Sequence, residues 1–276
     1  MQQFRKTRIA PTPSGYLHVG NGVSFALTYL LAQRAGADIL LRIDDLDRGR
    51  FRENYLKDIF ETLHWMGISW QEGPTSARQF EPWAQYQRLD RYFEFLENLR
   101  ATGMVYACDC SRKQVRADSQ NGRYAGTCRN KGLSLENADY AWRIRVPEGT
   151  VINFLDSKGA SETVELATKL GDFVVRKRFG KPSYQVSSTV DDLHFGIDFI
   201  VRGVDLREST AAQTYLAQVV GAERFGQIRF LHHPLLTDES GDKLSKSEGA
   251  PALKTWRAIG KDPAELFAIA KRWLVG

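Results

Sequence analysis

A strand, a turn rich in proline and glycine, and a helix follow one another at the start of this chain. The strand is predicted over Phe4–Ala10, the turn carries Pro11, Pro13 and Gly15, and the helix opens near Val19. The first amides of such a helix have no partner within it, and together with the positive end of the helix dipole they attract an anion. The beginning of the sequence therefore predicts an α/β fold with an anion-binding site between the first strand and the first helix.

Alternating strand and helix patterns continue toward Gly67. The apolar run Ile39–Ile43 ends in carboxylates, as a buried parallel strand would, and apolar side chains recur at helical spacing over Tyr55–Met66 and Tyr86–Leu99. From Met104 the character changes to clustered cysteines and short alternating segments. This change predicts a partly β insertion within the α/β domain.

Beyond Phe173 the α/β pattern resumes. We expect strands near Tyr184–Val186 and Phe199–Val201, and a helix that begins with Ser209 as its N-cap and ends at Gly221. A last apolar stripe predicts a terminal helix.

Composition limits the class of protein. The 276 residues are 42% hydrophobic, which is ample for a globular core, and the net charge of +5 is compatible with a polyanionic partner without demonstrating one. No apolar run approaches the roughly 20 residues that a membrane-spanning helix needs, and three cysteines do not make a secreted disulfide framework. We therefore expect a cytoplasmic protein with no membrane contact.

A second motif lies far along the chain. The segment Lys243–Ser247 reads Lys-Leu-Ser-Lys-Ser, and Gly241 and Gly249 give it the flexibility to close over a phosphate chain. Alone it would be interpreted as a solvated turn, just as a histidine beside a glycine in His18–Asn21 would be interpreted as structural. Taken together and in this order, the two motifs resemble the signature of class I aminoacyl-tRNA synthetases, which have a Rossmann-type catalytic domain.

The resemblance implies roles for both motifs. His18, Lys243 and Lys246 would be catalytic, and His18, Gly20, Asn21 and Lys246 would bind ATP, with magnesium expected alongside. The transition state of amino-acid activation spreads negative charge over phosphoryl oxygens, so the protein must supply cations and hydrogen-bond donors. The family's first motif usually ends in histidine, whereas Asn21 can donate a hydrogen bond but carries no charge.

Further matches resemble the glutamate branch of that family. They are Leu41–Asp47, Pro182–Gln185, Asp191–Asp192 and Val201–Leu206. By this resemblance, the residues that would line a glutamate site are Arg8, Ile9, Ala10, Pro11, Thr12, Asp44, Tyr184 and Arg202.

The chemistry of glutamate suits that set. Its two carboxylates would be held by Arg8 and Arg202 in two-pronged hydrogen bonds, and its ammonium would face Asp44. The family usually has glutamate where this chain has Asp44. The structural alternative for Arg202 is an ordinary ion pair with Asp205 or Asp198.

The three cysteines form a third constellation. Cys108 and Cys110 are one residue apart and Cys128 follows on a nearby loop, so three thiolates can form three corners of a tetrahedral zinc site. Asp109, water or a tyrosinate could be the fourth ligand. The glutamate branch often uses a tyrosine there, so the resemblance implies one structural zinc per chain with Tyr124 as the fourth ligand.

These patterns divide the chain into four parts. Residues 1–103 and 173–236 would be the halves of the Rossmann-type catalytic domain, 104–172 the zinc-bearing, partly β insertion, and 237–276 the Lys-Ser-Lys loop and a C-terminal helical segment.

Only residues 248–276 follow the second motif, too few for the helical domain that reads the anticodon in a full glutamyl-tRNA synthetase. The chain thereby resembles the bacterial glutamyl-queuosine tRNA(Asp) synthetases, a family that attaches activated glutamate to the modified base queuosine at the wobble position. This resemblance implies L-glutamate, ATP and the anticodon loop of tRNA(Asp) as partners, and we expect a monomer.

Other classes stay open at this stage. One is a truncated glutamyl-tRNA synthetase that charges a tRNA 3′ end, or a pantothenate-synthetase-like ligase with the same phosphate site. Another is a non-enzymatic, synthetase-like RNA-binding protein, against which His18, Lys243 and Lys246 argue.

Two basic segments are candidate phosphate contacts for RNA. One carries Arg48, Arg50 and Arg52, and the other comprises Arg176–Arg178 with Lys181. The alternative for both is a solvated charged surface.

Overall fold

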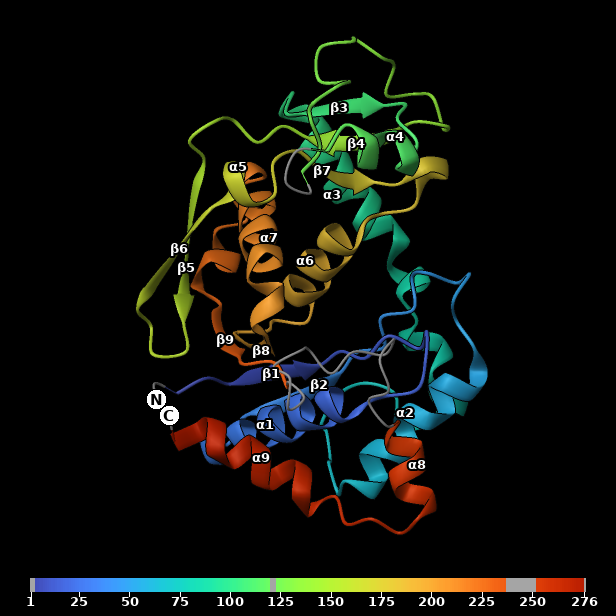
Figure 1. Cartoon of the computed structure of the whole chain (residues 1–276), viewed down its shortest axis with the longest axis vertical. Coiled ribbons are helices and arrows are strands. Elements are labelled where there is room, and N and C mark those ends of the chain that lie inside the picture. Colours follow the sequence, from blue (N-terminus) through green and yellow to red (C-terminus); the bar gives the residue numbers. More distant parts are fainter. Residues whose placement is uncertain (1–2, 120–122, 237–251, 276) are drawn as a thin grey trace. The chain divides into compact units, whose positions relative to one another are not determined.

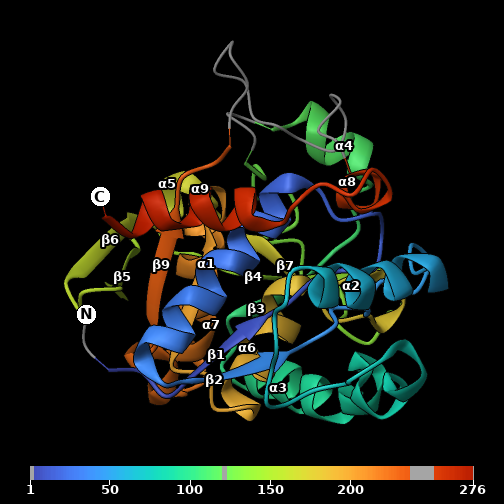
Figure 2. The ribbon, with the colours of Figure 1, turned by 90° about the horizontal axis from the view of Figure 1, so that it is seen from below.

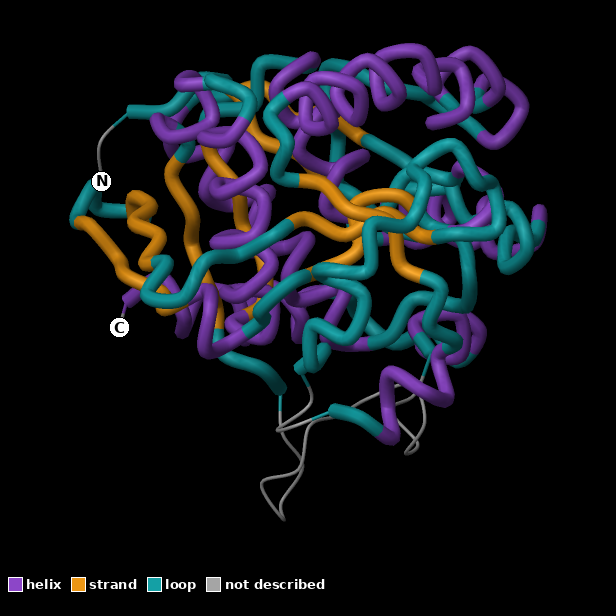
Figure 3. Tube along the Cα trace, turned by 90° about the horizontal axis from the view of Figure 1, so that it is seen from above, coloured by secondary structure: helices purple, strands orange, loops and turns teal. Residues whose placement is uncertain are grey.

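A computed structural model describes residues 3–119, 123–236 and 252–275 of the chain. The chain divides into two compact units (Figure 1). The first unit comprises Met1–Arg88, Gly196–Asp205 and Arg229–Gly276, and the second comprises Leu89–Phe195 and Leu206–Ile228. Both units combine helices with short strands (Figure 3).

The first unit contains two pairs of parallel strands. β1 (Lys6–Ile9) pairs with β2 (Asp38–Leu41), and β8 (Phe199–Gly203) pairs with β9 (Arg229–His233). β8 lies beside β1, because the Asp198 amide donates to the Lys6 carbonyl over 3.1 Å. The order β2–β1–β8–β9 reverses the direction of winding between β1 and β8, which is where open α/β sheets bind ligands at the carboxyl ends of their strands.

Four helices belong to this unit. They are α1 (Val19–Ala35), α2 (Glu53–Trp65), α8 (Leu253–Ala258) and α9 (Ala264–Val275). α9 packs against α1 (Figure 2). A Cβ atom at Gly22 would lie 2.8 Å from a Leu266 methyl carbon and 2.9 Å from one of Leu253. Glycine at this position therefore lets the last two helices approach α1 closely.

The first helix begins where the sequence predicts. α1 starts at Val19, and Gly36 follows it in the left-handed conformation (φ 64°), whose amide donates back to the last turn. Val23, Leu27 and Leu31 are fully buried in the core of the unit, so this helix is apolar because it is covered by the sheet and by α9.

The second unit has a three-stranded antiparallel sheet in the order β3–β4–β7 and a hairpin of β5 and β6. Its strands are β3 (Val105–Cys108), β4 (Ala141–Ile144), β5 (Val151–Asp156), β6 (Ser161–Glu165) and β7 (Phe173–Arg176). Its helices are α3 (Leu89–Ala101), α4 (Arg112–Ala117), α5 (Leu166–Lys169), α6 (Tyr184–His194) and α7 (Arg207–Val219). The predicted partly β segment is thus confirmed as short antiparallel strands.

Short 3₁₀ turns connect these elements. They cover Ala77–Gln79, Glu81–Trp83, Gln85–Arg88, Arg178–Gly180, Val204–Leu206 and Glu223–Gln227. The boundaries 1–103, 104–172, 173–236 and 237–276 that the sequence suggested stay a prediction.

Two local predictions were wrong. Tyr184–Val186 opens α6 and is not a strand, because the Ser183 hydroxyl caps the helix by accepting from the Val186 amide over 3.4 Å. Ser209 does not cap α7 but lies inside its first turn, where its hydroxyl accepts from the Gln185 side-chain amide over 3.1 Å. Each helix has a serine near its start, but only Ser183 caps its helix, because packing places Ser209 inside the first turn of α7.

None of the described helices is long and apolar enough to cross a membrane.

Candidate functional site

Two buried arginines lie at the carboxyl ends of the central strands of the first unit. Arg8 in β1 is 6% exposed and Arg202 in β8 is 3% exposed. Arg8 Nη1 donates to the Val201 carbonyl over 3.3 Å, and the Arg202 guanidinium lies over the Phe230 ring, 5.4 Å from its centre. Two guanidinium groups at this reversal of the sheet make a place for a ligand with more than one carboxylate.

Asp198 was one alternative partner for Arg202. Its carboxylate accepts hydrogen bonds from the backbone amides of Arg5 and Lys6 over 2.8 to 3.2 Å. That carboxylate therefore has a structural task at the start of β1, which leaves Asp205 as the remaining sequence-based alternative.

A third arginine, Arg42, holds the acid of the predicted site. Arg42 Nε donates to Asp44 Oδ1 over 2.7 Å and Arg42 Nη2 donates to Asp44 Oδ2 over 3.1 Å, and both residues are buried. The forked pair fixes the plane of the carboxylate. The sequence analysis did not include Arg42 in the site. The signal was available, because an arginine in a buried strand requires a carboxylate nearby.

The first turn lies beside the segment that follows β2. The Arg42 amide donates to the Ile9 carbonyl and the Asp44 amide donates to the Pro11 carbonyl, each over 2.9 Å. Pro11 is buried, Ala10 is half-buried and Thr12 is exposed. The turn is therefore fixed beside Asp44 by main-chain hydrogen bonds.

His18 is the N-cap residue of α1, with extended backbone angles. Its amide donates to Asn21 Oδ1 over 3.1 Å, so Asn21 caps the helix with the side-chain oxygen. A Cβ atom at Gly20 would lie 3.0 Å from two atoms of the His18 ring. Glycine thus makes room for the imidazole at the start of the helix. The roles of these residues toward ATP stay predictions.

Lys243 and Lys246 lie outside the described residues, but the segments on either side attach near the start of α1. After the gap, Ala252 forms a bridge with His18, and the Leu253 amide donates to the Leu17 carbonyl over 2.8 Å. Before the gap, His233 Nε2 lies 3.0 Å from the Ser24 hydroxyl of α1. Both attachments therefore join this part of the chain to the helix that His18 caps.

His233 is part of the same attachment. Its ring stacks on Trp273 with centres 4.9 Å apart, and its Nδ1 is 2.8 Å from the Pro234 carbonyl. Burial lowers the pKa of His233 below the ordinary histidine value, against the opposing effect of the Pro234 carbonyl. A neutral ring suits this apolar stacking.

Tyr184 is the first residue of α6 in the second unit, and its side chain is 41% exposed. Its assignment to the glutamate site stays a prediction.

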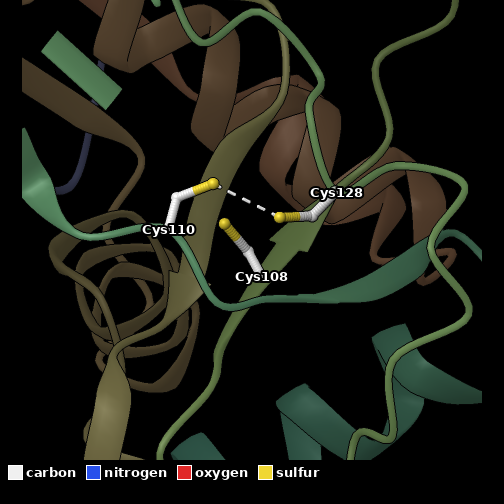
Figure 4. Close-up of side chains that lie close together, drawn as sticks. All are labelled: Cys108, Cys110 and Cys128. Carbon is white, nitrogen blue, oxygen red and sulfur yellow. Dashed lines mark hydrogen bonds between the residues drawn. The ribbon is translucent and has the colours of Figure 1, made fainter. Parts of the chain in front are cut away.

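The three cysteines come together in the second unit. Cys108 ends β3, Cys110 follows on the loop and Cys128 lies on a separate loop, and all three sulfur atoms lie within 4.8 Å of one another. Figure 4 shows the three side chains pointing toward one another, with Cys110 Sγ and Cys128 Sγ 3.3 Å apart. Cys108 and Cys128 are buried.

Tyr124 completes a fourth corner. Its hydroxyl oxygen lies 3.4 Å from Cys108 Sγ and 3.7 Å from Cys110 Sγ, and it accepts from the Cys128 amide over 2.8 Å. Asp109 touches the cluster at one point only, where the Cys128 thiol donates to its carboxylate over 3.0 Å. The phenol oxygen is thus the more central of the two oxygen donors.

The spacing fits a tetrahedral metal ion. With metal–sulfur bonds of about 2.3 Å, tetrahedral geometry puts two sulfurs about 3.8 Å apart and a sulfur and an oxygen about 3.5 Å apart. The tyrosine-to-cysteine distances of 3.4 and 3.7 Å agree with this closely. Small side-chain adjustments would bring the sulfurs to the same spacing, so the donor set is compatible with zinc.

A buried cation lies next to the cluster. The Arg143 guanidinium is 3.7 Å from the centre of the Tyr124 ring, and its Nε donates to Cys108 Sγ over 3.4 Å. Burial raises the pKa of Cys108, but its hydrogen bonds with Tyr124 and Arg143 outweigh burial and the net shift of the pKa is downward. Burial raises the pKa of Cys128 to about 12 and also raises that of Tyr124. The Arg143 guanidinium therefore favours the thiolate form of Cys108.

The comparisons with known proteins agree with this architecture. The family described as "tRNA synthetases class I (E and Q), catalytic domain" matches residues 5–274. The chain belongs to this family of class I tRNA synthetase catalytic domains.

Curated relatives give a narrower likeness. A protein of Pseudomonas syringae pv. syringae named Glutamyl-Q tRNA(Asp) synthetase is 42% identical over 89% of this chain and 78% of its own length. A protein of Pseudomonas putida with the same name is 37% identical over 96% of this chain and 92% of its own length.

Among solved structures, the glutamate-tRNA synthetase of Elizabethkingia anophelis superposes with a TM-score of 0.74 and 27% identity. The match covers 90% of this chain and 53% of that one, so the chain spans about half the length of that solved enzyme.

Proposed function

We propose that this protein activates L-glutamate with ATP and transfers it to the queuosine base at the wobble position of tRNA(Asp). The observation that carries the proposal is the name Glutamyl-Q tRNA(Asp) synthetase on relatives that match 89% to 96% of the chain. The paired buried arginines in a class I synthetase catalytic domain support glutamate as the amino acid.

In the first step, one carboxylate oxygen of glutamate attacks the α-phosphorus of ATP, and pyrophosphate leaves. Arg8 and Arg202 hold the two carboxylates, and Asp44, oriented by Arg42, faces the ammonium. By resemblance, Tyr184 and the backbone from Ile9 to Thr12 contact the same substrate.

His18, Lys243 and Lys246 stabilise the charge that develops on the phosphates. His18 and the amides that begin α1 donate to phosphate oxygens, together with Gly20 and Asn21, and magnesium accompanies the ATP. The attachment of Ala252 to His18 supports a shared site for the two motifs.

In the second step, a hydroxyl of queuosine attacks the acyl carbon of the glutamyl-adenylate, and AMP leaves. Queuosine carries a cyclopentene cis-diol that imitates the 2′,3′-diol of a terminal ribose. A catalytic domain built for an acceptor end can thereby receive an anticodon loop.

A zinc ion held by Cys108, Cys110, Tyr124 and Cys128 is the structural part of this proposal. When bound, it crosslinks β3 to the loop of Cys128. Arg143 would balance part of the negative charge of the thiolates and the tyrosinate.

The test mixes protein, ATP and labelled glutamate with tRNA(Asp) that carries or lacks queuosine. We expect label only on the queuosine-containing tRNA, and nuclease digestion should release it on a wobble-base nucleoside. Label on the terminal adenosine would instead identify a glutamyl-tRNA synthetase of the kind that the solved neighbour represents.

A further inference from the structure

A loop in the second unit carries four cations around one aromatic side chain. Residues 176–181, the basic loop, read Arg-Lys-Arg-Phe-Gly-Lys, and Lys177, Arg178, Phe179 and Lys181 are all exposed. The sequence suggested phosphate contacts here from the charges alone. The aromatic residue in the middle adds a second kind of chemistry.

The backbone of the basic loop is held in one shape. The Lys177 amide donates to the Lys181 carbonyl, and the Phe179 amide donates to the carbonyl of Ala138 on a neighbouring segment, each over 2.7 Å. Arg176 forms a bridge with Pro182 and closes the loop at its base. The backbone of the loop is therefore ordered before any ligand binds.

Two arginine side chains of the basic loop contact neighbouring segments. The Arg176 guanidinium lies 4.1 Å from the centre of the buried Trp142 ring. Arg178 Nη2 donates to the carbonyl of Asp109 over 2.5 Å, beside the cysteine cluster. The base of the loop is thus attached to the sheet and to the cysteine loop.

Phe179 is unusual in both conformation and exposure. Its φ of 61° makes it the one non-glycine residue with positive φ in the described part of the chain. Its side chain is 74% exposed. A phenylalanine in the left-handed region is strained where glycine or asparagine would not be, and an exposed ring gains nothing from the core. The stability of the fold therefore does not account for a phenylalanine here.

The three cations beside it are exposed, and Arg178 keeps other donor nitrogens besides the one that contacts the Asp109 carbonyl. Within residues 3–119, 123–236 and 252–275, no carboxylate pairs with Lys177, Arg178 or Lys181. The basic loop offers a flat aromatic face surrounded by positive charge, which is the combination that binds single-stranded nucleic acid through stacking and phosphate contacts.

The other basic segment, which carries Arg48, Arg50 and Arg52, differs because carboxylates pair with two of its arginines. Arg48 Nη1 donates to Asp45 over 2.6 Å, and Arg50 Nε donates to Asp47 over 2.7 Å. Arg52 Nη1 donates to nearby backbone carbonyls. Because Arg48 and Arg50 are already paired with carboxylates of their own segment, this segment is the weaker candidate for phosphate.

We propose that the basic loop binds an unpaired segment of RNA, with a nucleobase stacked on Phe179 and phosphates at Lys177, Arg178 and Lys181. Where that RNA is the anticodon loop of a tRNA, the proposal rests on the proposed function. A base in a duplex is already stacked between its neighbours, so the loop should distinguish a stem-loop from a duplex.

The test measures binding of the full chain to two labelled RNAs by fluorescence anisotropy. One is the anticodon stem-loop of tRNA(Asp), and the other is a fully paired duplex with the same number of phosphates. We expect Phe179→Ala to weaken stem-loop binding about tenfold or more and to leave duplex binding unchanged. Phe179→Trp should retain the preference for the stem-loop. Equal binding of the stem-loop by wild type and Phe179→Ala would overturn the proposal.

Two controls separate stacking from charge and from folding. Phe93→Ala removes another exposed ring, 42% exposed, between Tyr92 and Glu94, and should change neither affinity. Lys177→Ala should weaken both RNAs and reduce the salt dependence by about one counterion. Phe179→Asn suits the left-handed backbone, so it should keep or raise the melting temperature while it loses the stem-loop preference. Stem-loop binding by Phe179→Asn as tight as that of wild type would also overturn the proposal.

Failure of the loop's role in RNA binding and failure of the proposed function give different experimental results. Glutamate-dependent exchange of pyrophosphate into ATP without RNA tests activation, and Phe179→Ala should leave it unchanged. Absence of exchange in wild type would refute glutamate activation, whereas normal exchange together with a stem-loop affinity that Phe179→Ala does not reduce would refute only the role of the basic loop.

Discussion

The arginine site of the first unit and the cysteine cluster of the second unit are both buried groups of ionisable side chains, but they are fixed in different ways. Arg8 and Arg202 lie on adjacent strands whose hydrogen bonds and core hold them in place. Cys110 and Cys128 lie on loops. Their contacts in the cluster are between the two sulfur atoms and between the Cys110 sulfur and the Tyr124 hydroxyl oxygen. The first site therefore exists without its ligand, whereas the second depends on the metal that we propose for it.

This difference predicts that substitutions in the two sites have different effects. Substitutions in the first site should impair chemistry and leave the fold intact. Substitutions in the second should disturb the fold around the cysteines.

The largest effect should come from Cys110→Ser. We expect metal analysis to find about one zinc per chain in wild type and none in the variant, with a lower melting temperature, because the free energy of metal binding contributes to folding. Tyr124→Phe separates the ligands: retained zinc would assign the fourth position to Asp109 or water. A wild type that is folded and active without metal would contradict the site.

Next is Lys246→Ala. Removing one preorganised charge donor typically costs about 3–4 kcal/mol in the transition state, so pyrophosphate exchange should fall by about two to three powers of ten. The melting temperature should not change. The exposed Lys271→Ala is the matched control, and near-normal exchange in Lys246→Ala would remove this lysine from the mechanism.

A somewhat smaller effect is expected from Arg202→Ala, which leaves one glutamate carboxylate without its partner. The KM for glutamate should rise about 100-fold, and wild type should reject glutamine and aspartate. Steady-state exchange with the three amino acids measures this. Equal use of aspartate or glutamine would contradict the assignment of Arg8 and Arg202.

The smallest effect concerns a carboxylate of the second unit that touches no proposed ligand. Asp172 accepts from Arg129 over 2.6 and 2.8 Å, from the Tyr106 hydroxyl over 2.6 Å and from the Val146 amide over 2.7 Å. Burial raises its pKa, but these hydrogen bonds outweigh burial and lower the pKa below the usual value. Its stabilising contribution is therefore present above the unfolded-state pKa of about 3.9 and is lost as the pH falls through the folded-state pKa.

Thermal unfolding as a function of pH tests this contribution. Asp172→Asn should cost about 2 kcal/mol at neutral pH and progressively less in acid. The same cost at pH 3 and pH 7 would show that the carboxylate charge is not the cause.

The sequence predicted the elements with strong local signals. The first strand, the helix at Val19 and the approach of the three cysteines are confirmed. The sequence did not predict that the Asn21 side-chain oxygen caps the first helix, and the role of Asn21 as a donor to ATP stays a prediction.

The failures have two physical origins. The residues around Val186 and Val190 favour strands locally, yet residues 186–192 are buried on all sides, so a helix forms and packing overrides propensity. The pair of Arg42 and Asp44 was missed for another reason: the need of a buried arginine for a carboxylate was visible in the sequence, but the forked geometry appears only in the structure.

The first unit is assembled from three separate stretches of sequence, and this affects how the chain folds. Arg8 and Val201 meet although they are 193 positions apart in the sequence, and α1 is covered by Leu253 and Leu266 from the last stretch. Closing such long loops is entropically costly, and non-local contacts of this kind slow folding. During synthesis, β1 and α1 emerge long before the strands and helices that cover them. The early part of the chain must therefore remain incompletely packed on the ribosome until residues beyond 228 have been made.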